Sequence, residues 1–110
     1  MDAQAAKQDA PPRPDDPALI ELCRRHRVRR LDLFGSAATG AFDPARSDLD
    51  FLVEFEELEP VAYADAFFGL REDLQALFGR KIDLIVESSL KNPYFRESVL
   101  AERRRLFEAA

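Results

Sequence analysis

The sequence of 110 residues contains one cysteine, one histidine and no long run of apolar residues. Cys23 cannot form a disulfide within the chain, so no internal cross-link supports the fold. His26 has no nucleophile to pair with, and together with Cys23 it lacks the further ligands that a zinc site needs. We therefore expect His26 to be a surface or boundary residue.

The absence of long apolar runs also bears on the cellular compartment of the protein. No stretch is long enough to cross a bilayer, and the amino terminus has no apolar centre like that of a signal peptide. A single cysteine is compatible with a reducing compartment. These features predict a cytoplasmic protein.

Acidic residues outnumber basic ones: 21 Asp and Glu stand against 16 Lys and Arg, which gives a net charge of −5. This balance argues against general affinity for nucleic acid backbones. Positive charge is nevertheless clustered at Arg24, Arg25, Arg27, Arg29 and Arg30, and again at Arg103, Arg104 and Arg105. Such runs usually form solvated helix faces. The alternative is a local docking surface for an acidic partner or a polynucleotide end.

The composition predicts one small domain. Residues 1–14 are rich in Ala, Gln, Asp and Pro and offer little to bury, so we expect a disordered tail before a domain that spans residues 15–110. Hydrophobic residues make up 46% of the chain and nine are phenylalanine, which is enough for a core. A domain of this size buries a modest part of its surface, so its stability can depend on a partner.

The spacing of apolar residues predicts the order helix, strand, strand, helix, strand, helix. Asp16 and Pro17 are a cap and a first turn for the first helix. A short strand follows and ends at Phe34. Residues 35–47 are expected to form a loop with one turn of helix after Ser36.

The second half of the chain contains a long helix, a strand and a last helix. The long helix runs from Pro60 to a stop at Gly79. We interpret its aromatic stripe as core packing rather than as a base-stacking platform, because its period fits one buried face. A strand over residues 81–86 comes next, and the last helix begins at Asn92 and continues through Phe107.

The strand over residues 48–55 is the clearest element. One of its sides carries Leu49, Phe51, Val53 and Phe55, and the other carries Asp48, Asp50, Leu52 and Glu54. Because the apolar side must face the core, Asp48 and Asp50 face away from it. They lie about 7 Å apart along an extended chain, and two carboxylates so placed repel each other unless a cation lies between them.

Hard divalent cations such as magnesium take oxygen ligands, and the phosphates of a bound nucleotide often complete their shell. Upstream of the aspartates, Gly35 and Ser36 form a short turn whose backbone N–H groups can face such phosphates. A third acid, Asp83, lies in the middle of the strand over residues 81–86, where an isolated carboxylate would be poorly placed. Together these residues indicate metal-assisted phosphoryl or nucleotidyl transfer.

The motifs resemble those of the nucleotidyltransferase superfamily with the Gly-Ser…Asp-x-Asp signature, in particular its minimal nucleotidyltransferase branch. Gly35 and Ser36 are similar to the phosphate-binding pair, residues 47–50 to the Ser-Asp-x-Asp segment, and residues 81–86 to the strand with the third carboxylate. The resemblance extends over residues 19–107, nearly the whole chain after the tail. It implies an α/β fold of the polymerase beta-like type, a small mixed sheet flanked by helices.

The resemblance also implies roles for these residues. Two magnesium ions would be held by Asp48, Asp50 and Asp83, and Asp83 would help to activate the attacking hydroxyl. Gly35 and Ser36 would bind the triphosphate of ATP or another nucleotide. Ser47 would either cap the strand entry or touch a phosphate. The reaction would be transfer of a nucleoside monophosphate from the triphosphate to an acceptor.

The chain departs from the signature at one place. Many relatives read Gly-Ser-Arg-Ala-Arg-Gly, whereas this chain has alanine at position 37 and threonine at position 39. Two positive charges near the phosphates are therefore missing. Either nucleotide affinity is lower, or basic groups come from elsewhere, including a partner.

The acceptor is not evident from the residues. Proteins of this size in the branch lack a second domain for an antibiotic or a tRNA end, and many are antitoxins that modify a tyrosine of a helical HEPN-domain ribonuclease toxin. The resemblance therefore implies transfer of AMP to a partner protein. A different class of function is a binding module that silences its partner by covering it, with weak or absent catalysis. The missing arginines favour that alternative, whereas the complete set of aspartates opposes it.

Overall fold

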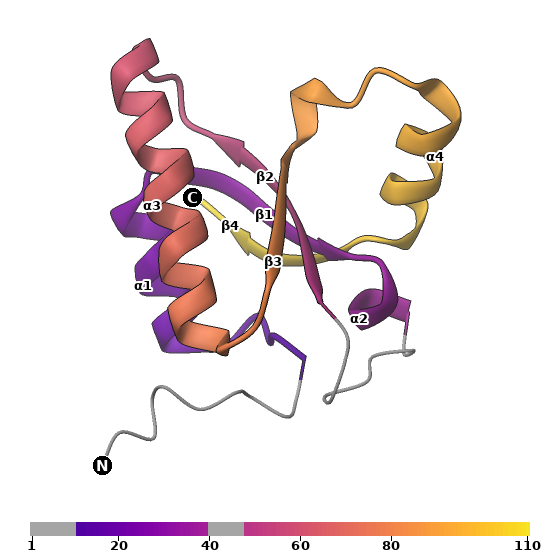
Figure 1. The fold of residues 1–110 in the computed structure, drawn as a ribbon, viewed down its shortest axis with the longest axis horizontal. Helices are drawn as coiled ribbons and strands as arrows, with labels where there is room; N and C mark the ends of the chain where they lie inside the picture. Colours follow the sequence, from indigo (N-terminus) through magenta and orange to yellow (C-terminus); the bar gives the residue numbers. More distant parts are fainter. Residues whose placement is uncertain (1–10, 40–47) are drawn as a thin grey trace.

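The structure is a computed structural model, and it describes residues 11–39 and 48–110 (Figure 1). The elements are, in order, α1 (Pro17–Arg25), β1 (Val28–Phe34), α2 (Ser36–Thr39), β2 (Leu49–Phe55), α3 (Pro60–Phe78), β3 (Ile82–Val86), the 3-10 turn η2 (Glu87–Ser89), α4 (Pro93–Glu102) and β4 (Arg104–Glu108). None of the helices in these two ranges has the length and apolar character that crossing a bilayer requires.

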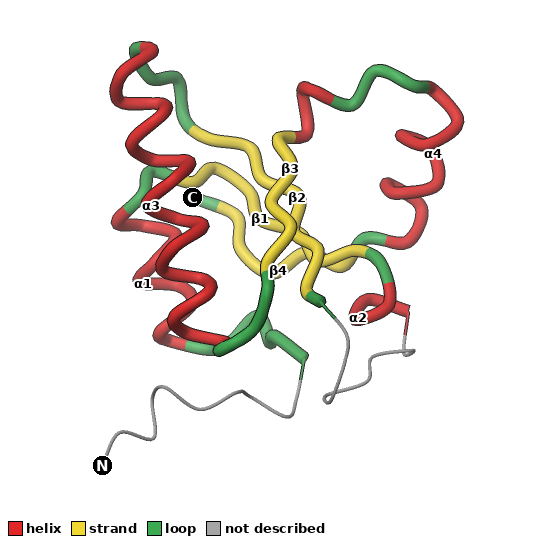
Figure 2. Tube along the Cα trace, in the orientation of Figure 1, coloured by secondary structure: helices red, strands yellow, loops and turns green. Residues whose placement is uncertain are grey.

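The strands form one four-stranded mixed sheet in the order β3-β2-β1-β4 (Figure 2). β2 and β3 run parallel, and β1 is antiparallel to both of its neighbours, β2 and β4. A parallel pair needs a crossover connection, which α3 supplies between β2 and β3. The small mixed sheet flanked by helices agrees with the predicted fold class.

One face of the sheet packs against α1 and α3 (Figure 1). The alternation of the strands places Leu33 of β1 and Phe51 and Val53 of β2 in this core, each no more than 1% exposed. α3 contributes Leu70, Leu74 and Phe78, with Tyr63 and Phe67 packed against the cluster. The interpretation of the aromatic stripe of α3 as core packing is confirmed.

Local signals begin α1 and α4 and end α3 where the sequence predicts. Asp16 caps α1, its side chain accepting a hydrogen bond of 3.0 Å from the N–H of Ala18. Asn92 caps α4 in the same manner. α3 ends at Gly79, whose φ of 64° lies in the left-handed region that favours glycine.

His26 joins α1 to α3. Its Nε2 atom lies 2.7 Å from Oδ2 of Asp73, and its side chain is 14% exposed. The ring packs against Gly69 of α3, where an added β-carbon would overlap it. This glycine lets the ring lie close to the helix, so His26 occupies the boundary position that we expected.

α4 lies over the opposite face of the sheet (Figure 1). Its buried residue is Val99, which clusters with Phe34 of β1 and Leu52 of β2. In the first turn of α4, Tyr94 is 83% exposed and Phe95 is 49% exposed. α4 is therefore held to the sheet by a small cluster and leaves aromatic side chains in solvent.

β4 occupies the end of the last predicted helix, so that part of the prediction was wrong. α4 ends at Glu102, and Arg103 has the extended backbone angles φ −67° and ψ 150°. β4 then pairs with β1, and Leu106 is buried in the core beside α1 and α3. The apolar pattern that includes Leu106 and Phe107 predicted a helix. It is overridden because β4 pairs with β1, and this pairing satisfies the backbone N–H and C=O groups of β4.

Arg103, just before β4, and Arg105 within it bind a buried acid and do not form the solvated helix face that we predicted. Asp32 in β1 is 1% exposed, and Nη1 of Arg103 lies 3.2 Å from its Oδ2 atom. The guanidinium of Arg105 contacts Oδ1 of the same carboxylate. A carboxylate at this depth needs partners, so the two arginines tie the edge strand to β1.

The first arginine cluster is divided among separate ion pairs on α1 and β1. These pairs are Arg25–Asp73, Arg27–Glu56 and Arg30–Glu87. Arg24 and Arg29 are exposed. Much of the charge in this cluster is compensated within the domain, which weakens its interpretation as one docking surface.

We expect Arg105→Met to lower the free energy of unfolding by about 2 kcal/mol, because the buried carboxylate of Asp32 then keeps one partner in place of two. The matched control is Arg104→Met, which changes an exposed arginine in the same strand and should have an effect below about 0.5 kcal/mol. Urea unfolding followed by circular dichroism measures both variants. Equal losses would show that the contact with Asp32 adds nothing to the stability of β4.

Candidate active site

The parallel pairing of β2 and β3 brings two of the predicted site residues together. Asp50 of β2 is directly opposite Asp83 of β3, and on its other side it is opposite Phe34 of β1. Both carboxylates lie on the face of the sheet that α4 partly covers, since Leu49, Phe51 and Ile82 face the other core. The predicted orientation of Asp50 away from the main core is confirmed.

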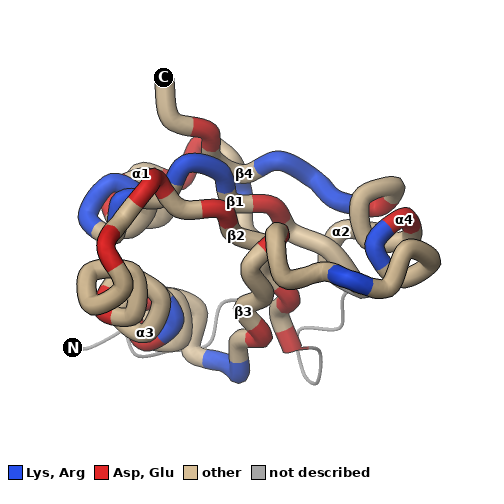
Figure 3. Tube along the Cα trace, turned by 90° about the horizontal axis from the view of Figure 1, so that it is seen from above, with Lys and Arg blue, Asp and Glu red and all other residues tan. Residues whose placement is uncertain are grey.

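Asp48 immediately precedes β2 and is exposed. Between it and Asp50, the N–H of Leu49 donates a hydrogen bond of 3.2 Å to the carbonyl of Lys81, the residue before β3. The two strand entries are thereby fixed side by side. Figure 3 shows acidic positions at the beginning of both strands.

The electrostatic environment of Asp50 is unfavourable for a negative charge. Burial raises the pKa of Asp50 to about 6, and a hydrogen bond from the neutral carboxyl to Asp83 and the charges of Asp83 and Asp48 act in the same direction. Such a group is stabilised in its charged form by a nearby cation. Two adjacent carboxylates are also the oxygen donors that magnesium prefers.

The predicted metal ligands thus fit a divalent ion in their chemistry, although the side chains are not gathered around one point. Within residues 11–39 and 48–110, no three acidic, histidine or cysteine side chains converge closely enough to hold an ion. Asp50 and Asp83 are already neighbours, whereas Asp48 is exposed at the strand entry. Binding at this edge would draw the carboxylate of Asp48 toward the other two.

Gly35 places the loop after β1 against Asp50. It has a φ of 75°, and an added β-carbon would overlap Oδ2 of Asp50. The chain therefore turns directly beside the carboxylate, and only glycine leaves room there. The sequence analysis missed this contact, although a glycine directly after a strand is the usual signal of such a close approach.

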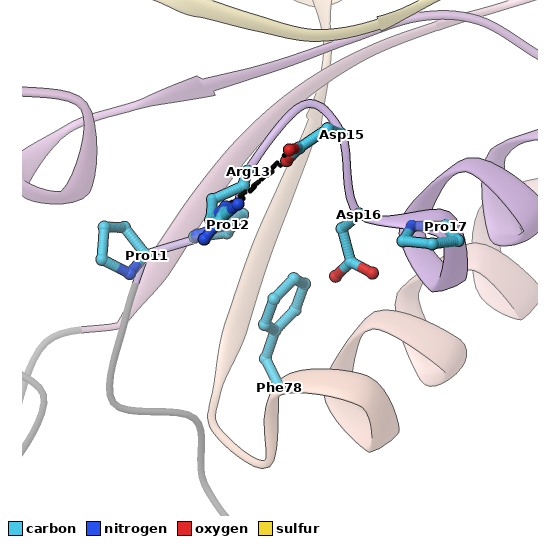
Figure 4. A pocket seen from close by; sticks show the side chains of 7 residues that line it. All are labelled: Pro11, Pro12, Arg13, Asp15, Asp16, Pro17 and Phe78. Carbon is cyan, nitrogen blue, oxygen red and sulfur yellow. Dashed lines mark hydrogen bonds and ion pairs between the residues drawn. The ribbon is translucent and has the colours of Figure 1, made fainter.

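The remaining nucleotide-binding candidates are only partly described. Ser36 is the first residue of α2, the single turn of helix that we predicted after it. Ser47 lies outside the described residues. A hollow of about 330 Å³ is lined by the segment 11–17 and Phe78 (Figure 4), and none of the predicted site residues lines it.

We expect Asp50→Asn to raise the free energy of unfolding at pH 7 by about 1 kcal/mol in the absence of metal. The charged form of a half-buried acid is penalised, and solvent screening keeps the gain well below that of a fully buried group. The folded state holds the proton of Asp50 more tightly than the unfolded state, where the pKa is 3.8. The contribution of Asp50 to stability is therefore complete below about pH 4 and is lost as the pH rises through about 6.

Urea unfolding of both proteins between pH 4 and pH 7 measures this difference, which should shrink toward pH 4. Magnesium should narrow it at pH 7 by stabilising the wild type. Asp65→Asn, on the exposed side of α3, removes the same charge elsewhere and should give no comparable gain. A difference between wild type and Asp50→Asn that does not change with pH would contradict the environment described for Asp50.

Known proteins are similar to this chain over about two thirds of its length or more. The model of the nucleotidyltransferase domain family matches residues 18–106. Protein adenylyltransferase MntA of Thermococcus cleftensis is 42% identical over 72 residues, which cover 66% of this chain and 69% of that protein. A candidate protein adenylyltransferase of Methanocaldococcus jannaschii is 36% identical over 78 residues, or 71% of this chain and 76% of that protein.

Solved structures agree with these matches. One described as a candidate minimal nucleotidyltransferase has a TM-score of 0.65 at 38% identity, over 79% of this chain and 84% of the other. The crystal structure of a toxin–antitoxin with AMP-PNP has a TM-score of 0.64 at 22% identity, over 86% and 74% of the two chains, a likeness that shows a shared fold. The chain therefore belongs to the nucleotidyltransferase family, in its minimal branch, and has the fold of these enzymes.

Proposed function

We propose that the protein transfers AMP from ATP to a hydroxyl of a partner protein, with magnesium bound by Asp48, Asp50 and Asp83. The observation that carries this proposal is the pair Asp50 and Asp83, opposite each other on parallel strands, with Gly35 turning the chain beside them. The relatives named as protein adenylyltransferases support the choice of reaction.

In the proposed reaction one bond to phosphorus forms and another breaks. The acceptor oxygen forms a bond to the α-phosphorus of ATP, the bond from that phosphorus to the bridging oxygen of the β-phosphate breaks, and pyrophosphate leaves. The proton of the acceptor hydroxyl passes to solvent or to a neighbouring carboxylate. Bound magnesium would supply charge compensation for the phosphates and the entering oxygen. The chain itself contributes position more than covalent chemistry.

Asp83 is the residue to which we assign the contact with the acceptor. It is exposed in β3, whereas Asp50 is half-buried between β1 and β3. The raised pKa of Asp50 shows that its charged form is disfavoured there, and a nearby cation would stabilise that form. We infer that Asp50 and Asp48 serve mainly to hold metal and nucleotide, and that Asp83 orients the attacking hydroxyl and lowers the cost of its deprotonation.

The partner that we propose is a helical HEPN-type toxin, for which this protein is the cytoplasmic antitoxin. The toxin–antitoxin structure with AMP-PNP and the related MntA–HpeT structure have the same fold as this chain, which supports the proposal. On this chain, α4 exposes Tyr94 and Phe95, and α3 exposes Val61 and Phe68. Apolar groups of this kind on a small domain are candidates for a protein contact.

A second candidate is neutralisation by complex formation, with transfer weak or absent. It is favoured by Ala37 and Thr39 of α2, which carry no positive charge where many relatives have arginine. The two candidates differ in one observable quantity. Complex formation alone leaves the mass of the partner unchanged, whereas transfer adds a nucleotide.

The direct test is co-expression with the helical protein encoded by the neighbouring gene, followed by size-exclusion chromatography and intact mass measurement. We expect co-elution and, with ATP and magnesium, a gain of AMP mass on a tyrosine of the partner. Asp48→Asn with Asp50→Asn should reduce the rate by more than about a hundredfold without unfolding the protein. Asp65→Asn is the matched control on α3.

Two outcomes would overturn this proposal. If a folded Asp48→Asn, Asp50→Asn variant transferred AMP at the wild-type rate, the assignment of Asp48 and Asp50 as metal ligands would be wrong. A neighbour that neither co-elutes nor gains mass would remove the antitoxin role and leave a small molecule or RNA as the acceptor to be tested.

We further expect Asp83→Asn to slow the chemical step by more than about a hundredfold while changing ATP affinity by less than about threefold, because its proposed contact is with the acceptor hydroxyl. Calorimetric titration with ATP and single-turnover transfer at saturating ATP, on one preparation, separate the two effects. If affinity collapses while the rate at saturation survives, Asp83 holds the nucleotide and does not act on the acceptor.

A further inference from the structure

We propose that Lys81 binds the β- or γ-phosphate of the nucleotide and supplies positive charge near the phosphates, where positions 37 and 39 carry none. The inference rests on the proposed function, since it concerns the same triphosphate. It gives a role to a residue of the segment 81–86 to which the sequence analysis assigned none.

The backbone fixes Lys81 next to the carboxylates. Its carbonyl oxygen accepts the 3.2 Å hydrogen bond from the N–H of Leu49, the residue between Asp48 and Asp50. Lys81 also precedes Asp83 by two positions, so in extended chain the two side chains project to the same side. Lys81 is exposed, and its four-carbon stem lets the ammonium reach beyond the strand entry.

The charges around this edge are unbalanced. Asp48, Asp50 and Asp83 lie at or near the beginning of β2 and β3. A bound triphosphate would add several more negative charges. Figure 3 shows the basic turn between α3 and β3 beside the acidic entries of β2 and β3. That turn contains Arg80 and Lys81. Arg80 already has an interaction of its own.

Lys81 differs from most basic residues of the domain because its charge is uncommitted. Within the described residues, Arg25, Arg27, Arg30, Arg103 and Arg105 are each paired with an acid. No acidic side chain in residues 11–39 and 48–110 pairs with Lys81. A lysine left free beside three carboxylates is available to an anion that arrives with its own cations.

The ammonium of Lys81 would act as a fixed point charge on the phosphates. It would hold the triphosphate in the ground state and compensate the charge that builds on pyrophosphate as the bond to the α-phosphorus breaks. No proton needs to leave Lys81 in this step. Because the proposed contact is with the β- or γ-phosphate, AMP, which has neither, cannot make it.

The test compares Lys81→Gln, Lys81→Arg and Lys91→Gln in the full chain. Lys91→Gln removes the same charge from an exposed lysine beyond the far end of β3. Calorimetric titration with ATP and with AMP, each with magnesium, measures affinity. Transfer assays at varied ATP and varied partner give the two KM values separately, and thermal unfolding confirms that each variant is folded.

We expect Lys81→Gln to weaken ATP binding by about tenfold or more and to leave AMP binding unchanged. In the transfer assay, the KM for ATP should rise and the KM for the partner should not. Lys81→Arg should keep most of the affinity because it keeps the charge, and Lys91→Gln should match the wild type.

ATP binding by Lys81→Gln equal to that of the wild type would overturn the proposal, and so would an equal loss for ATP and AMP or a change confined to the KM for the partner. These results differ from failure of the proposed function, in which the wild type itself transfers nothing. In that case the ATP titration still decides the role of Lys81. A wild type that binds no ATP overturns both proposals.

Discussion

The in-register parallel pairing of β2 with β3 places two carboxylates, Asp50 and Asp83, directly opposite each other. Without a cation this arrangement costs free energy, because each negative charge disfavours the other and Asp50 is also partly desolvated. The arrangement persists because residues on the other side of the same strands, among them Phe51 and Ile82, are buried in the main core. Packing on one face of the sheet thus enforces electrostatic repulsion on the other.

The same face of the sheet carries a second acid whose surroundings are the reverse. Asp32 is more deeply buried than Asp50, yet it contacts the guanidinium groups of Arg103 and Arg105. Asp50 faces other acids, whereas Asp32 faces cations supplied by the edge strand β4. Burial alone therefore does not separate a structural acid from a functional one. The neighbouring charges differ in sign, and under the proposed function a bound ligand would supply the positive charge on the β2–β3 side.

The parts of this arrangement that could be predicted are those that depend on neighbouring residues in the chain. The alternation over residues 48–55 indicates which way Asp50 points, and Asp16, Asn92 and Gly79 begin or end helices through short-range hydrogen bonds and backbone angles. β4 was missed because it forms only when β1 is present to pair with it. The contact between Gly35 and Asp50 is likewise a property of two strands in register.

The position of α4 relates the carboxylates to the exposed aromatic residues. Val99 of α4 clusters with Leu52, which lies two residues after Asp50 on the same side of β2. A helix of 10 residues with one buried side chain gains little from its own sheet. A protein that covered Tyr94 and Phe95 would bury more of α4 and would approach the sheet from the face on which Asp50 and Asp83 lie. Under the proposed function, binding and modification of one partner would then use the same side of the domain.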